Sequence, residues 1–192
     1  MPTNHVTLWN QAAAIVGGNA KGLIQSSVEE SSIADYCRAF WNEAVDVSLI
    51  FLRPVEAIKF VNIAASSDTP ENSDWTYIYD LPADYLDLIV YADDADRTQN
   101  NAFEIVGDYI FSDVNECYLK YLAKMDYEDT TKMSVGLRQL AVANLAVMIA
   151  PFYKPGMLQI AEGKLAKAEQ RSSDMSTWHG YEEKVTSSAD IT

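Results

Sequence analysis

Apolar residues recur at helical spacing over residues 33–51. They form one stripe whose members lie three, four or seven positions apart: Ile33, Tyr36, Cys37, Phe40, Trp41, Ala44, Val47 and Phe51. Such a stripe predicts a helix that forms one wall of a hydrophobic core. Ser27 and Glu30 have the spacing of a capping box at its start, and Ser32 with Asp35 is the alternative start.

Helical spacing returns in the last third of the chain. Leu137–Phe152 and Met157–Ala168 each carry an apolar face, and Pro151 with Pro155-Gly156 predicts a break between them. Because the link is short, the two helices are expected to pack as antiparallel neighbours. Two shorter helices are predicted near the other end, at residues 8–16 before Gly17-Gly18 and at residues 55–61 after Pro54.

The middle of the chain alternates instead. Trp75, Tyr77 and Tyr79 occupy every second position, Leu81–Asp84 interrupts the run, and residues 86–91 resume it. Residues 102–106 and 109–111 flank Gly107-Asp108, a pair that suits a two-residue hairpin turn, and residues 115–122 supply a further strand. These segments predict a mainly antiparallel sheet of three to five strands, or a pair of hairpins.

The elements together predict an α+β fold. A bundle of about four helices forms a single domain at residues 1–170, with a small antiparallel β insertion at about residues 75–122. Periodicity ends after Ala168, and the Ser/Thr-rich residues 171–192 are expected to be an extended C-terminal arm. On this polar arm Trp178, His179 and Tyr181 are the predicted partner-binding residues, because isolated aromatics are good anchors. The alternative is that the arm folds back onto the helices.

Charge and cysteine content reduce the number of functional classes to which the chain could belong. The formal net charge of -14 argues against a protein that grips nucleic acid phosphates. It is compatible with a surface past which nucleic acid slides, and equally with acidity that only aids solubility. Cys37 and Cys117 are expected to be buried free thiols. We find no secretory signal and expect no membrane span, so the chain is expected to fold in a reducing cytoplasm.

No catalytic motif emerges from the sequence. His5 and His179 are the two histidines, one near each end, and no phosphate loop or nucleophile elbow is present. The densest acidic cluster holds Asp84, Asp87, Asp93, Asp94 and Asp96. A calcium loop starting at Asp93 fails because Ala95, Arg97 and Thr98 replace its ligands and glycine. We therefore expect a solvated loop, no cofactor and no enzyme, with a metal-dependent hydrolase as a remote alternative.

The pattern Trp-x-Tyr-x-Tyr-x-Leu-Pro-x-Asp-x-Leu at residues 75–86 resembles the head-to-tail adaptor proteins of short-tailed phages, often called tail tubular protein A. The resemblance extends over about Leu8–Asp174. It implies a ring of twelve copies at the head-to-tail junction of the virion, made in the host cytoplasm from monomers. It also implies an arm along the portal protein, a β-rich portion facing the tail nozzle, and DNA in non-specific transit. The alternative is a stand-alone bacterial protein-binding or regulatory module.

Overall fold

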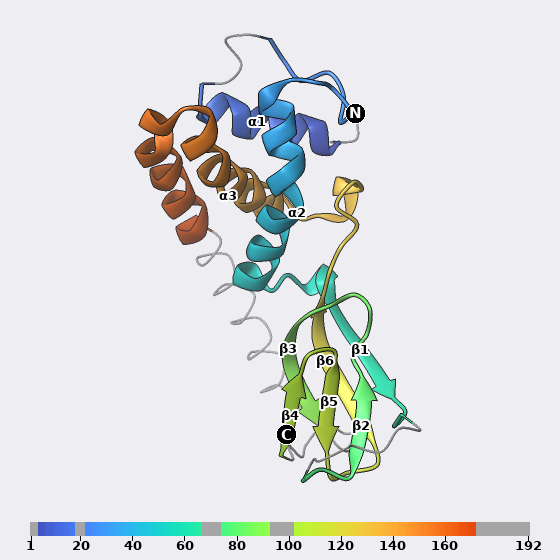
Figure 1. Ribbon diagram of the computed structural model, residues 1–192. Coiled ribbons are helices and arrows are strands. Elements are labelled where there is room, and N and C mark those ends of the chain that lie inside the picture. The colour runs from blue at the N-terminus through green and yellow to red at the C-terminus, as the bar shows by residue number, and fades with distance from the viewer. Residues whose placement is uncertain (1–3, 18–21, 67–73, 93–101, 172–192) are drawn as a thin grey trace, which may run out of the picture. The chain divides into compact units, whose positions relative to one another are not determined.

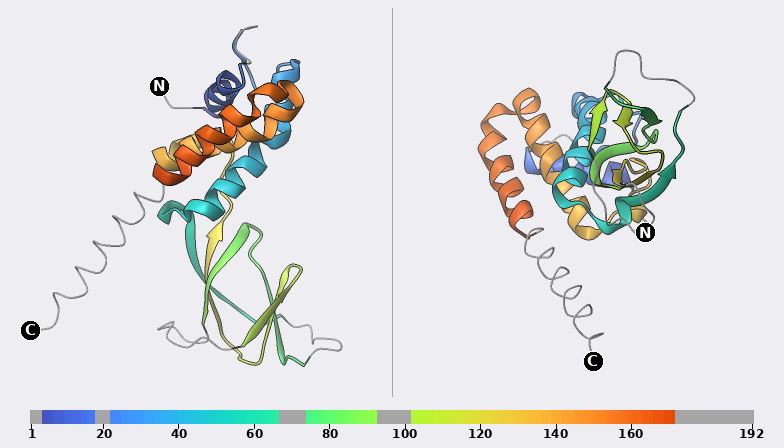
Figure 2. Two further views of the ribbon diagram at one scale, coloured as in Figure 1. Left: turned by 90° about the vertical axis from the view of Figure 1, so that its left-hand side faces the viewer. Right: turned by 90° about the horizontal axis from the view of Figure 1, so that it is seen from below.

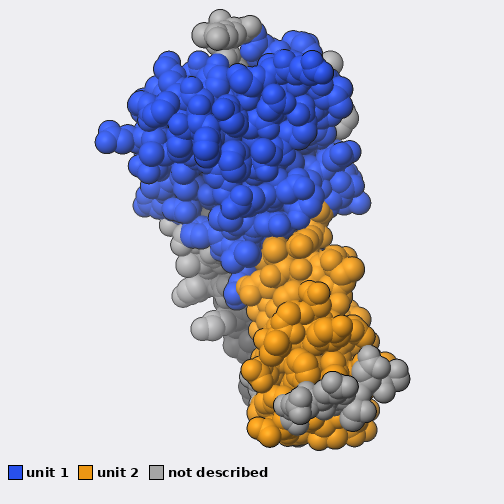
Figure 3. All heavy atoms as spheres, viewed as in Figure 1, with its two compact units in different colours: residues 1–56, 126–192 blue, residues 57–125 orange. Residues whose placement is uncertain are grey.

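The chain divides into two compact units. The computed structural model describes residues 4–17, 22–66, 74–92 and 102–171. Unit 1 comprises residues 1–56 and 126–192, and unit 2 comprises residues 57–125 (Figure 3). Unit 1 is helical and unit 2 is built of strands, so the predicted α+β class is confirmed (Figure 1). The arm at residues 172–192 lies outside the described residues.

Helix α3 is the centre of unit 1. The unit contains α1 (His5–Ile15), α2 (Ser32–Leu52), α3 (Val135–Tyr153) and a helix at residues 158–171. The large apolar residues of α3 are buried as predicted, namely Leu137, Leu140, Leu145 and Ile149. Small residues on other faces of α3 are buried as well. Among the described residues, α3 alone is long and apolar enough to cross a membrane by length and composition. However, 61% of it is buried within the protein, as expected of a core helix.

Helix α2 begins at Ser32, the alternative start, but neither Ser27 nor Ser32 is its N-cap. Ser31 is the N-cap residue, and its hydroxyl accepts a hydrogen bond from the Ala34 N–H at 3.4 Å. Ser27 lies in a separate turn that precedes the helix. The Arg38 side chain holds this turn by donating to the carbonyls of Ser27 and Glu29, at 2.9 and 3.1 Å. The capping-box prediction is therefore wrong, because Ser27–Glu30 is stabilised by a helical arginine instead.

The buried face of α2 also departs from the predicted stripe. Ile33, Cys37, Trp41 and Ala44 are buried, but Val47 and Phe51 are 41% and 49% exposed. Val45, Ser48 and Leu49 take their place in the core. Asn144 of α3 donates a hydrogen bond to the Ser48 hydroxyl at 2.9 Å, so a polar pair lies at this α2–α3 contact. Hydrophobic spacing could not show that a serine faces the core.

The break after α3 comes later than predicted. Pro151 lies inside α3, and the helix ends at Tyr153, followed by the 3-10 turn η4 (Pro155–Met157). The helix at residues 158–171 then returns alongside α3 (Figures 1 and 2), as the predicted antiparallel pair requires. Ala161 is fully buried in it, whereas Ile160, expected on the apolar face, is 51% exposed.

Unit 2 consists of two three-stranded antiparallel sheets with strand orders β1-β6-β3 and β2-β5-β4 (Figures 1 and 2). Their bounds are β1 (Ile58–Ile63), β2 (Tyr77–Asp80), β3 (Tyr85–Ala92), β4 (Phe103–Val106), β5 (Tyr109–Ser112) and β6 (Cys117–Ala123). The hairpin around Gly107-Asp108 is confirmed. The six strands within the described part of unit 2 exceed the predicted three to five.

The insertion begins earlier than residue 75. Only a 3-10 turn, η2 (Val55–Ala57), is helical where a helix at residues 55–61 was predicted. Residues 58–63 form β1, which pairs with β6 in a register that sets Ile58 opposite Leu122. Since β6 lies about sixty residues downstream, the local pattern could not indicate this pairing.

The core of unit 2 is aromatic and lies between its two sheets. Tyr79 and Ile110 from one sheet meet Tyr91, Leu119 and Tyr121 from the other. Buried tyrosines need partners for their hydroxyls. The hydroxyl of Tyr91 donates to Ser112 Oγ at 2.7 Å, and that of Tyr79 donates to the Val114 carbonyl. These bonds let large rings fill the core without an unpaired polar end.

Each unit contains one cysteine. Cys37 of α2 and Cys117 of β6 are both buried free thiols, as predicted. Burial raises the pKa of each thiol to about 12, so both are protonated and unreactive at neutral pH.

Directly after unit 2 the chain is hydrogen-bonded to α2, because the Tyr127 carbonyl accepts from Trp41 Nε1 at 2.8 Å. The turn η3 (Thr130–Lys132) then leads into α3.

Candidate interaction surfaces

The predicted partner-binding residues are not placed by the structure. Trp178, His179 and Tyr181 lie outside the described residues. Their role in docking a partner therefore stays a prediction. The described residues instead present two surfaces in unit 1 that the sequence had not singled out.

The predicted acidic cluster is split. Asp93, Asp94 and Asp96 lie outside the described residues, whereas Asp84 is part of the framework of unit 2. Its carboxylate pairs with Lys59 Nζ of β1 and accepts from the Tyr121 hydroxyl of β6 at 2.9 Å. Within the ranges that the structure describes, no three His, Cys, Asp or Glu side chains are grouped to hold a metal ion. Asp84 thus links β1 to β6 through its contacts with Lys59 and Tyr121.

The ionisation of Asp84 follows from these bonds. Burial alone would raise its pKa, but the hydrogen bonds from Lys59 and Tyr121 outweigh burial and hold the pKa below its usual value. Burial and the bond to Asp84 raise the pKa of Tyr121 to about 12, which keeps its hydroxyl a donor. The charged form of Asp84 therefore stabilises the β1-β6-β3 sheet.

We predict an acid-sensitive contribution of Asp84 to unit 2. A depressed pKa stabilises the folded state above the unfolded value of about 3.9, and this stability is lost as pH falls through the folded pKa. Asp84→Asn should destabilise unit 2 at pH 7 and remove part of its loss of stability between pH 5 and 3. Urea unfolding followed by tyrosine circular dichroism, with exposed Asp80→Asn as control, measures both. An unchanged pH slope in Asp84→Asn would refute the assignment.

An aromatic cluster opens to solvent at the α2–α3 contact. The Phe152 ring of α3 stacks on Tyr36 and Phe40 of α2, with ring centroids 5.7 and 5.4 Å apart. Such pairs add stability beyond the area they bury. Yet Phe152 remains 58% exposed, and Tyr36 and Phe40 are only half-buried. The cluster is therefore partly core and partly surface.

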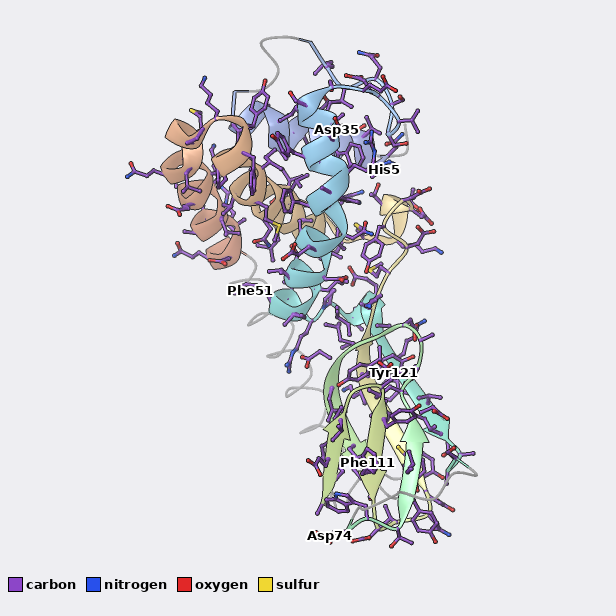
Figure 4. The ribbon with its side chains drawn as sticks, viewed as in Figure 1. His5, Asp35, Phe51, Asp74, Phe111 and Tyr121 are labelled. Atoms are coloured by element: carbon purple, nitrogen blue, oxygen red, sulfur yellow. The ribbon has the colours of Figure 1, made fainter. Side chains whose placement is uncertain are left out.

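The exposed apolar row continues along α2. Val47 and Phe51 follow Phe40 at i+7 and i+11, which places them on the same face of the helix. Phe51 lies at the C-terminal end of α2 (Figure 4). We call Tyr36, Phe40, Val47, Phe51 and Phe152 the aromatic ridge. Contiguous exposed apolar side chains of this kind mark protein interaction sites, and aromatic residues dominate binding energy there.

The second surface is a groove of about 190 Å³ between α1, α3 and the helix at residues 158–171. Its floor is apolar and consists of Ile15, Val142, Ala143 and Ala168. Its rim is polar and cationic, with Gln11, Gln139, Lys164, Lys167 and Arg171. We call this site the basic groove.

The charge of the basic groove contrasts with the rest of the chain. Lys164, Lys167 and Arg171 are spaced i, i+3 and i+7, so they lie on one helical face. In the described part of the chain none of the three forms an ion pair. The sequence analysis used only the apolar face of Met157–Ala168 and overlooked the spacing of these three cations, which was the available signal.

No protein-family model matches the chain, and no curated protein matches it. The two surfaces suit different ligands. The aromatic ridge is exposed and apolar and suits another protein. The basic groove is concave, with an apolar floor beneath cations, and suits an anionic group attached to an apolar one.

Proposed function

We propose that the chain is a structural head-to-tail adaptor of a short-tailed phage. Copies would form a ring between the portal protein and the tail nozzle, and DNA would pass through it without specific contacts. The resemblance of residues 75–86 to that family is the sequence observation that supports this proposal. The aromatic ridge is the observation that carries the proposal, because a ring subunit must keep an apolar contact surface exposed until it assembles.

The aromatic ridge suits contact between copies better than a purely polar surface would. Phe51, Phe152 and Val47 are between 41% and 58% exposed, so each has area left to bury against a neighbour. A head-to-tail contact between different faces of identical copies generates a closed ring when the rotation closes. Association costs translational and rotational freedom, so a small ridge leaves free copies monomeric. A portal ring that positions copies side by side offsets part of that cost.

The charge of unit 2 is consistent with the proposed place of the protein. Residues 57–125 hold thirteen Asp and Glu residues and four Lys and Arg residues. Such a surface repels phosphates and offers little non-specific affinity for nucleic acid. In the proposed adaptor, which belongs to the virion at the head-to-tail junction, an acidic β unit would face passing DNA and the nozzle without holding the DNA.

Phe51→Ser tests the role of the aromatic ridge. The variant should fold like the wild type, because Phe51 is half exposed, yet fail to form rings on portal protein from the same phage. The matched control is Val135→Ser, which removes an apolar side chain that is 61% exposed in unit 1 but off the ridge. Size-exclusion chromatography with light scattering measures the assembly. Normal rings from Phe51→Ser, or equal loss in the control, would reject the ridge as the contact.

A stand-alone bacterial protein-binding or regulatory module is the second candidate, and the exposed ridge also favours it. Such a module would be a monomer or dimer that ignores portal protein. The same chromatography therefore separates the two candidates.

A further inference from the structure

We propose that the basic groove is a binding site for the chain's own C-terminal arm. Tyr181 would lie on the apolar floor, and Glu182 and Glu183 would pair with the cations of the rim. This inference is independent of the phage role, since it concerns a single free copy.

The size and lining of the basic groove suit one aromatic side chain. A cavity of about 150 Å³ is known to hold a benzene molecule, and the groove measures about 190 Å³. Ile15, Val142 and Ala168 offer the ring an apolar floor. The side-chain amides of Gln11 and Gln139 at the rim can donate to a carboxylate or to the tyrosine hydroxyl.

Charge complementarity selects the segment of the arm. In residues 172–192, Tyr181 directly precedes the adjacent carboxylates Glu182 and Glu183. Lys164, Lys167 and Arg171 provide cations on one helical face for these two carboxylates. An aromatic residue beside two acids therefore matches an apolar floor beside three cations.

The course of the chain makes an intramolecular contact the favoured one. The last described residue, Arg171, itself lines the basic groove, so the arm departs from the groove's edge. The ten residues from Arg171 to Tyr181 span at most about 33–36 Å, which is ample for a return to the same groove. A short tether gives an effective concentration in the millimolar range, so even a weak site is filled by its own arm.

Nucleic acid is a poorer occupant of the basic groove. Phosphate binding would use the three cations but leave the apolar floor without a partner. The net charge of -14 also repels a polyanion as a whole, whereas a short peptide carries only two or three charges.

Competition with a free peptide tests the proposal in the chain of 192 residues. The probe is a fluorescent peptide of residues 176–186, and the groove is vacated by the variant Tyr181→Ser/Glu182→Gln/Glu183→Gln. This arm variant should bind the peptide at least tenfold more tightly than the wild type, whose own arm competes. Adding Lys164→Glu/Lys167→Glu to the arm variant should abolish binding. Adding Lys124→Glu/Lys132→Glu, an equal charge change at residues that do not line the groove, should leave binding intact.

Three outcomes would overturn the proposal. They are equal peptide affinity in the wild type and the arm variant, binding that survives the reversal at Lys164 and Lys167, and groove-dependent binding of a single-stranded oligonucleotide in place of the peptide. Protection of the buried Cys37 thiol in every variant shows that unit 1 is folded. Because the assay contains no phage protein, its failure would leave the adaptor role untouched, and failure of ring assembly would leave this site untouched.

Discussion

Leu145→Ala is expected to lower the free energy of unfolding of unit 1 by about 2–5 kcal/mol, because it leaves a cavity in a well-packed core. Leu145 is fully buried on α3, the helix around which α1 and α2 pack. Phe40→Ala should cost less, since Phe40 is only half-buried and its ring borders solvent beside Phe152.

The loss of stability of unit 1 can be measured through the reactivity of the Cys37 thiol, in a background where Cys117→Ala removes the other thiol. Cys37 is buried in α2, and it should react with a thiol reagent only when unit 1 opens. Labelling across a urea titration then gives the stability of unit 1 alone. A loss below about 1 kcal/mol for Leu145→Ala would mean that the core of unit 1 is assigned wrongly.

Leu119→Ala is expected to lower the free energy of unfolding of unit 2 by a similar amount, about 2–5 kcal/mol. Leu119 is buried on β6, the central strand of the β1-β6-β3 sheet. Its side chain lies among the tyrosines between the two sheets. Truncating it removes contacts with both sheets at once.

The two units are expected to respond separately to these changes. Leu119→Ala should increase the reactivity of Cys117, measured in the Cys37→Ala background, and leave that of Cys37 unchanged, measured in the Cys117→Ala background. Leu145→Ala should increase the reactivity of Cys37 and leave that of Cys117 unchanged. Each unit has its own buried core, which is the physical reason to expect separate opening. If both thiols became reactive together in either variant, the chain would unfold as one cooperative body.

Elements whose pattern is local could be predicted from the sequence. The central helix at Val135–Tyr153 carries apolar residues on every face, and Gly107-Asp108 joins two short alternating runs. In both cases the residues that define the element lie within one helix or one hairpin. Their spacing therefore contains the information that fixes them.

Elements that depend on partners far away in the sequence could not be predicted from it. Strand β1 has Phe60 half exposed and Lys59 pointing to Asp84, so it lacks a clean alternation and depends on pairing with β6. The core position of Ser48 depends on Asn144, which lies 96 residues away. The basic groove combines residues from three helices at opposite ends of the sequence. Spacing within a segment contains none of these relations.

The aromatic ridge shows the same limit for function. The α2 stripe had too many large apolar residues for one core face, and the surplus, Val47 and Phe51, lies outside. Only the position of α3 decides which apolar residues of α2 are buried and which remain available to a partner.

The mass of the complex formed with portal protein tests the adaptor role most directly. The purified chain is mixed with portal rings from the same phage, and light scattering gives the mass of each species. The adaptor role predicts a monomer of 21.4 kDa for the chain alone and a ring of copies bound to each portal, twelve by the family resemblance. A chain that stays monomeric beside intact portal rings, while its Cys37 and Cys117 thiols remain protected, would contradict it.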